Sequence, residues 1–164
     1  MSVEENPTPE DLTWLRRTFR LAEATKAAGK HPFASIVVDA DGRIVAEAGN
    51  NSLPPDGDPT QHAEVVAASR AARLRSPAEL SACTIYTSAE PCCMCAGAIY
   101  WCNIGRVVYA LSEERLLGLT GNHPENPTLS LTCRSVFASG QHPVAVLGPL
   151  LEEEASQVHQ GFWR

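Results

Sequence analysis

The spacing of apolar positions near the start of the chain predicts an amphipathic helix from Pro9 to about Gly29. Leu12, Leu15 and Phe19 recur at helical spacing and share one face, whereas arginines occupy other positions. Glycine is common immediately after helices because it adopts the left-handed conformation without a Cβ clash, so Gly29 suits the end of this helix.

Further along, short apolar runs alternate with longer amphipathic stretches. Asp41-Gly42 between two apolar runs is a hairpin signal. Pro91 indicates the start of a helix, because proline is favoured in the first turn. The expected strands are Ala34–Ala40, Arg43–Ala48, Cys83–Thr87, Arg106–Ala110 and Val144–Leu147, and the expected helices are Gln61–Leu74, Pro91–Cys102, Ser112–Leu117, Leu129–Ser139 and one from about Leu150, with loops at Asn50–Pro59 and Thr120–Pro127.

Strands that alternate with helices in this way indicate an α/β layer fold whose sheet is at least partly parallel. The length of 164 residues suits one compact domain, and the sequence contains neither an internal repeat nor a low-complexity tract. We therefore expect a single domain over residues 1–164.

Composition and charge narrow the functional class. The hydrophobic fraction of 44% and the charged fraction of 20% are typical of a soluble globular protein. No apolar stretch is long enough to cross a bilayer, and the acidic start of the chain lacks the features of a signal peptide, so a cytoplasmic location and no membrane partner are expected. A net charge of −6 argues against a nucleic-acid partner, because binding a phosphate backbone favours a basic surface. A small-molecule substrate is expected instead.

Four of the six cysteines lie between Cys92 and Cys102. A chain of this length does not need disulfides to fold, and clustered thiols favour metal binding in a reducing compartment. Cys92 and Cys95 are three positions apart, so both sulfur atoms can lie on one face of the first turn of the helix predicted after Pro91. Zinc binds thiolates, which the positive end of a helix dipole stabilises.

His62 is the expected third ligand, with Glu64 two positions later. In a regular helix these two side chains would diverge, but both can reach a metal that lies beyond the helix N-terminus. One histidine and two cysteines leave a fourth coordination position open, which is typical of a catalytic zinc site. Glu64 is then the expected proton shuttle. H-x-E followed by P-C-x-x-C is the signature of zinc nucleobase deaminases.

Two other interpretations of these motifs are less favoured. A structural zinc site would need a fourth protein ligand at matching spacing, and the sequence has no second C-x-x-C pair. A redox C-x-x-C pair would not account for His62 or Glu64. The prediction is therefore one Zn²⁺ per subunit, held by His62, Cys92 and Cys95, in an enzyme that attacks a ring carbon with hydroxide and releases ammonia.

From about Pro32 to Ala110 the sequence resembles the cytidine deaminase-like superfamily, within the branch of guanine deaminases and bacterial tRNA adenosine deaminases. The resemblance is carried by HPFASIVVD, NNSLPPDGDPTQHAEVVA, YTSAEPCCMCAGAIYW and IGRVVYA. It implies a three-layer α/β/α sandwich with a five-stranded mixed sheet, usually assembled as a homodimer or larger. It also implies that the C-terminal Phe162-Trp163 segment closes the pocket, from the same or a neighbouring subunit, although ordinary packing of a last helix would explain it equally.

The same resemblance implies substrate contacts. The expected substrate-binding residues are Phe33, Asn50, Ala63, Trp101 and His123. Guanine deaminases of the bacterial type carry an aspartate for the amino edge of guanine, where this chain reads Leu119-Thr120-Gly121-Asn122-His123. The substrate is thus expected to be a guanine-like or related aminated heterocycle, as free base or nucleoside. The alternative is a tRNA-specific adenosine deaminase, which the negative charge and the acidic C-terminal region disfavour, and a further alternative is a non-catalytic zinc-stabilised module.

Overall fold

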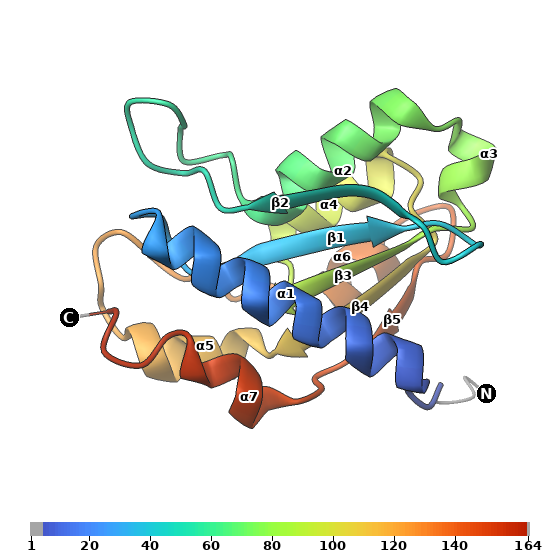
Figure 1. Cartoon of the computed structure of the whole chain (residues 1–164). Helices are drawn as coiled ribbons and strands as arrows, with labels where there is room; N and C mark the ends of the chain where they lie inside the picture. Colours follow the sequence, from blue (N-terminus) through green and yellow to red (C-terminus); the bar gives the residue numbers. More distant parts are fainter. Residues whose placement is uncertain (1–4, 164) are drawn as a thin grey trace.

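One mixed sheet organises the computed structural model, which describes residues 5–163 (Figure 1). Strand β1 is antiparallel to its neighbours β2 and β3, whereas β3, β4 and β5 are parallel to one another. In spatial order the strands are β2 (Ile44–Gly49), β1 (Ala34–Val38), β3 (Thr84–Ala89), β4 (Arg106–Leu111) and β5 (Ala145–Leu147).

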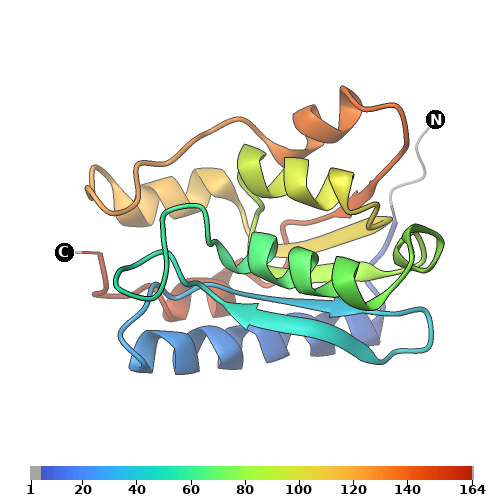
Figure 2. The ribbon, with the colours of Figure 1, turned by 90° about the horizontal axis from the view of Figure 1, so that it is seen from above.

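Helices cover both faces of this sheet. One face packs against α2 (Ala63–Leu74), α4 (Cys93–Trp101) and α6 (Cys133–Ala138) through a core that includes Ile99 and Phe137. The other face packs against α1 (Pro9–Ala27) and α7 (Glu152–Gln157), and Figure 2 shows α1 on the side of the sheet opposite to α2 and α4. The expected three-layer α/β/α sandwich with a five-stranded mixed sheet is confirmed.

Several element boundaries differ from the sequence prediction. The hairpin connection spans residues 39–43 rather than two, because the Asp39 carboxylate accepts hydrogen bonds from the Asp41 and Arg43 amides. The helix expected at Leu129–Ser139 begins only at Cys133, where the Thr132 side chain caps the first turn. The short helix α3 (Pro77–Leu80), capped by Ser76, was missed, because four residues carry too little apolar periodicity to detect.

A buried ion pair anchors α1 to the sheet. Both oxygens of Asp11 accept hydrogen bonds from the Arg106 guanidinium at 2.9 Å, and Tyr86 donates to the same carboxylate at 2.7 Å. Burial alone would raise the pKa of Asp11, but hydrogen bonds from Arg106, from the Thr8 amide and from Tyr86 bring it well below its usual range.

β1 begins, and β2, β3 and β4 end, at the same end of the sheet. Because β1 pairs with β2 as Ala34 with Gly49, Phe33 and Asn50 lie side by side, and the Asn50 amide donates to the Phe33 carbonyl at 2.9 Å. On the other side of β1, β3 pairs in parallel with β4, so Glu90 follows the end of β3 next to Leu111. The helix α5 (Glu113–Thr120) begins directly after β4. This register brings residues distant in sequence to one end of the sheet.

Among residues 5–163, no helix combines the length and the apolar character needed to span a bilayer.

Candidate metal centre and active site

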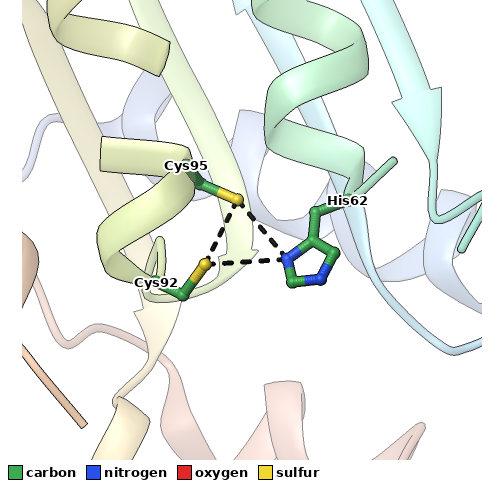
Figure 3. A group of neighbouring side chains, drawn as sticks. All are labelled: His62, Cys92 and Cys95. Carbon is green, nitrogen blue, oxygen red and sulfur yellow. Dashed lines mark hydrogen bonds between the residues drawn. The ribbon is translucent and has the colours of Figure 1, made fainter. Parts of the chain in front are cut away.

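The three expected metal ligands come together between the N-terminal ends of α2 and α4 (Figure 3). His62 and Cys92 are the N-cap residues of these helices, and both have extended backbone angles that direct the side chain beyond the helix end. Cys95 lies in the first turn of α4. The helix therefore begins after Cys92 rather than at Pro91, and the expectation that the metal lies off two helix N-termini agrees with this arrangement.

The spacing of the three ligand atoms fits a tetrahedral zinc ion. The Sγ atoms of Cys92 and Cys95 are 3.5 Å apart, and His62 Nδ1 lies 3.7 Å from the first sulfur and 3.5 Å from the second. With Zn–S near 2.3 Å and Zn–N near 2.1 Å, tetrahedral angles place two sulfurs about 3.8 Å apart and nitrogen about 3.6 Å from each. The three atoms thus form one face of a zinc tetrahedron, and the fourth corner is left for a non-protein ligand.

The protonation of the two thiols is coupled. A hydrogen bond from the Cys95 thiol lowers the pKa of Cys92 to about 4 despite its burial, with further contributions from His62 and the Cys95 amide. The same hydrogen bond to Cys92, together with burial, raises the pKa of Cys95. This pair supplies one thiolate readily, and a bound cation would favour deprotonation of the second.

Glu64 lies in the first turn of α2 beside the ligands, and only 5% of it is exposed. Its Oε1 accepts a hydrogen bond from the Thr87 hydroxyl at 2.8 Å, and its Oε2 lies 3.2 Å from Cys95 Sγ. Burial raises the pKa of Glu64. The carboxylate is therefore held next to the metal position by a residue of β3 that sequence reasoning did not identify.

A second buried hydroxyl supports this contact. Ser35 on β1 donates to Thr87 Oγ1 at 3.0 Å, and both residues are fully buried. The Thr87 hydrogen lies within reach of Glu64 and of the Ala89 carbonyl at 3.0 Å, and the shorter, charged contact is the stronger one. The register between β1 and β3 places these two hydroxyl groups together, so a local sequence pattern does not predict the contact.

A narrow cavity of about 50 Å³ opens beside the ligands. It has room for about one or two water molecules, so a heterocyclic ring must displace part of its lining. Phe33 and Asn50 line it as expected. The other lining residues are His62, Glu64, Ala89, Glu90, Cys92, Glu113 and Leu116.

Asn50 itself is fixed by local hydrogen bonds. Its side-chain oxygen accepts from the Ser52 amide at 2.9 Å and from the Ser52 hydroxyl at 2.8 Å. The side-chain amide nitrogen of Asn50 is thus directed by this turn, and it remains available as a donor at the cavity wall.

Two acidic residues of the cavity, Glu90 and Glu113, were missed by sequence reasoning. Glu90 accepts hydrogen bonds from the amides of Glu113 at 3.1 Å and Cys133 at 3.3 Å, which holds the starts of α5 and α6 at the cavity. Burial, followed by the negative charges of Cys92 and Glu90, raises the pKa of Glu113 to about 8. The sequence signals for them are the tripeptide Glu90-Pro91-Cys92 and the position of Glu113 just after a strand.

Three predicted substrate-binding residues lie outside this cavity lining. Ala63 is fully buried in the core beneath α2. His123 packs its ring against Trp163 with centroids 5.3 Å apart. Trp101 lies at the opposite end of α4 from Cys92, about 13 Å away along the helix axis, and is 84% exposed, so its contact with a substrate stays a prediction.

The C-terminal Phe162-Trp163 segment packs against the cavity wall of its own chain. The Trp163 ring lies 6.0 Å from that of Phe33 and 5.1 Å from that of His31, and Trp163 Nε1 donates to His159 Nδ1 at 3.0 Å. The closing role that the resemblance implies is compatible with this placement.

A larger open groove of about 790 Å³ lies between the end of α1 and α2, and none of the metal ligands line it. Its basic residues are Lys30, Arg70 and Arg73. The groove shares Asn50 with the small cavity, so the two lie next to each other.

Comparison with known proteins agrees with this geometry. Residues 8–111 match the family model described as the cytidine and deoxycytidylate deaminase zinc-binding region. The chain belongs to this family. The match covers the metal ligands, Glu64 and the strands that position them.

The relatives of this deaminase include several substrate classes. It is 42% identical to a probable cytosine deaminase of Schizosaccharomyces pombe over 94% of this chain and 93% of that protein. It is 44% identical to a guanine deaminase of Bacillus subtilis over 60% of this chain and 62% of that protein. It is 36% identical to a tRNA-specific adenosine deaminase of Haemophilus influenzae over 94% of this chain and 83% of that protein.

Solved structures give the same assignment. The guanine deaminase from Nitrosomonas europaea superposes with a TM-score of 0.75 at 27% identity, over 96% of this chain and 85% of that one. A chain in complex with 2,6-diaminopurine superposes with a TM-score of 0.76 at 27% identity, over 96% of this chain and 83% of that one. The protein is thus an enzyme of the nucleobase or nucleoside deaminase class.

Proposed function

We propose that this deaminase hydrolyses the exocyclic C–N bond of a free nucleobase or nucleoside, a guanine-like or related aminated heterocycle, with one Zn²⁺ per subunit. The observation that carries the proposal is the triangle of His62 Nδ1 and the two sulfurs, with the Glu64 carboxylate beside it and not part of it. Three protein ligands with an adjacent acid are suited to activating water.

Each residue of the site has a distinct role in this reaction. Zinc, when bound, supplies hydroxide at neutral pH by lowering the pKa of water. Glu64 accepts the proton that the water loses, and donates it to the ring nitrogen next to the reacting carbon. After the C–O bond has formed, Glu64 takes the remaining proton of that oxygen and passes it to the amino group; the C–N bond then breaks, the carbonyl forms, and the amino group leaves as ammonia. Asn50 and Phe33 would hold the ring edge and the ring face.

Charge favours a small substrate over RNA. The net charge is −6, and among residues 5–163 the cavity lining includes three glutamates and no lysine or arginine, so it offers a phosphate no cationic partner. The relatives named cytosine deaminase and guanine deaminase support the same class. The tRNA alternative would have to use the basic groove beside the cavity.

The test is ammonia release over a panel of guanine, cytosine, adenosine, an aminotriazine and a tRNA anticodon stem. We expect turnover of at least one free base or nucleoside. Activity on the RNA alone would establish the alternative, and a protein with stoichiometric zinc but no activity would indicate a structural metal site. Glu64→Ala should abolish turnover and retain zinc, because Glu64 is not a ligand; turnover at the wild-type rate would refute the assigned shuttle.

We also propose that the enzyme is a cytoplasmic homodimer. Its six cysteines are all free, as expected in a reducing compartment. Trp101 and Leu74, at the ends of the adjacent helices α4 and α2, are 84% and 60% exposed, which favours burial against a second copy. Sedimentation equilibrium of the wild type and of Trp101→Glu tests this: a dimer that dissociates in the variant is expected, and a monomeric wild type would refute it.

A further inference from the structure

Glu113 lies at the cavity but has no part in the reaction described above. It is the first residue of α5, it is 9% exposed, and it lines the cavity together with Glu64, His62 and Cys92. Its backbone amide donates to Glu90, but among residues 5–163 its carboxyl oxygens take part in no hydrogen bond. These oxygens are not enclosed by the protein either, so a ligand in the cavity can reach them.

The backbone that carries this side chain is held firmly. The Glu113 amide donates to Glu90 Oε1 at 3.1 Å. One residue earlier, the amide and hydroxyl of Ser112 both donate to Glu152 Oε2, at 3.1 and 2.9 Å. The start of α5 is therefore fixed by acids from two other elements, while the Glu113 carboxyl group remains free. Fixed placement with an unused acceptor is the arrangement expected of a binding group.

We propose that Glu113 is a specificity-determining residue that accepts hydrogen bonds from N–H donors on the substrate ring, at an edge away from the reacting carbon. The proposal rests on the proposed function. An ionised carboxyl group has two acceptor oxygens and no donor, so it matches an edge with a ring N–H next to an exocyclic amino group. Burial and the negative charges of Cys92 and Glu90 raise the pKa of Glu113 before substrate binds, whereas N–H donors of a bound ring favour its ionised form. This identifies the substrate class as an aminated heterocycle with a second N–H-bearing edge, in addition to the amidine that is hydrolysed.

The same position in the first turn of a helix could also serve stability alone, since acids there interact favourably with the helix dipole. Glu114 provides the matched control, because it is the next residue in the same turn and is exposed. Loss of the dipole interaction should affect Glu113→Gln and Glu114→Gln alike, whereas loss of a substrate contact should affect only the first.

The experiment measures kcat/KM of the zinc-loaded enzyme and both variants on the same panel of bases and nucleosides. Glu113→Gln is expected to lower kcat/KM for the preferred substrate about 10- to 100-fold and to change the order of preference, because an amide N–H would face the N–H donors of the ring. Glu114→Gln is expected to keep kcat/KM within about twofold of the wild type and to leave the order of preference unchanged. Glu113→Asp, which keeps the carboxylate but shortens its reach, should raise KM and preserve the order of preference.

Three results would overturn the proposal. The first is an unchanged order of preference and kcat/KM in Glu113→Gln. The second is an equal loss on every substrate together with a lowered melting temperature, which would indicate a structural role. If Glu113→Gln does not fold, Glu113→Asp tests the proposal instead. The third overturning result is an unchanged KM in Glu113→Asp. A wild type that deaminates no base or nucleoside would instead refute the proposed function and, with it, this assignment.

Discussion

The hydrogen bond from Thr87 to Glu64 gives the sharpest test of how the fold supports the chemistry. Thr87→Val replaces the hydroxyl by a methyl group of similar size, so the core between β1 and β3 stays filled. The bond is 2.8 Å long, fully buried, and directed to a carboxylate. A hydrogen bond to a charged group contributes about 1.5–3 kcal/mol.

If this contact orients Glu64 in the transition state, its loss lowers kcat by about 10- to 100-fold, since 1.4 kcal/mol corresponds to a factor of ten. KM should change little, because Thr87 does not line the cavity. Stability should fall by about 1 kcal/mol, since Ser35 loses its acceptor.

The assay is steady-state ammonia release by the zinc-loaded variant, with metal content and unfolding by urea measured on the same preparation. Thr87→Ser keeps the hydroxyl and is the matched control, expected to retain most of the activity. A fully metallated, folded Thr87→Val enzyme with kcat within twofold of the wild type would show that Glu64 is positioned without this bond.

Three further predictions concern the metal, the first helix and the C-terminal segment. Cys95→Ala removes one of three ligands and should abolish stoichiometric zinc in elemental analysis; one zinc retained per chain would contradict the ligand set. Asp11→Asn should lower the free energy of unfolding by about 2 kcal/mol at pH 7. Because the pKa of Asp11 is lowered in the folded state, this difference should shrink as the pH falls below about 4, and an equal difference at pH 7 and pH 3 in urea unfolding would refute it. Burial, with a smaller effect of Lys26, lowers the pKa of His159 from 6.5 to about 4, so the wild type should lose up to about 3 kcal/mol of stability as the pH falls through this window. His159→Gln should remove that loss. If the free energy of unfolding of His159→Gln depends on pH as that of the wild type does, the prediction is wrong.

Chemistry that depends on short spacings could be predicted from the sequence. His62, Cys92 and Cys95 were identified because metal ligands require particular side chains in particular local conformations, and an N-cap residue or a first helical turn creates these locally. An α/β layer fold with a partly parallel sheet also followed from the alternation of apolar runs with amphipathic helices, whereas the five-stranded mixed sheet was implied by the family resemblance. Periodicity reflects burial of one face, which a chain must achieve whatever its detailed topology.

The lining of the cavity followed less directly from the sequence. Trp101 was predicted to contact the substrate, and the structure places it at the exposed end of α4, outside the cavity lining. Glu113 was missed, since a glutamate in the first turn of a helix is ordinary in sequence. Its burial at the cavity results from the parallel pairing of β4 with β3.

The amino-acid sequence by itself indicated which residues could bind a metal, which acid accompanies them and which class of fold holds them, because these follow from local spacing and periodicity. Only the tertiary structure decided which hydroxyl holds Glu64 and which carboxyl group faces the cavity without a hydrogen bond. Those contacts join β1, β3, α2 and α5 over separations of 23 to 52 residues. Long-range register is a property of the packed sheet, so a local pattern carries no trace of it.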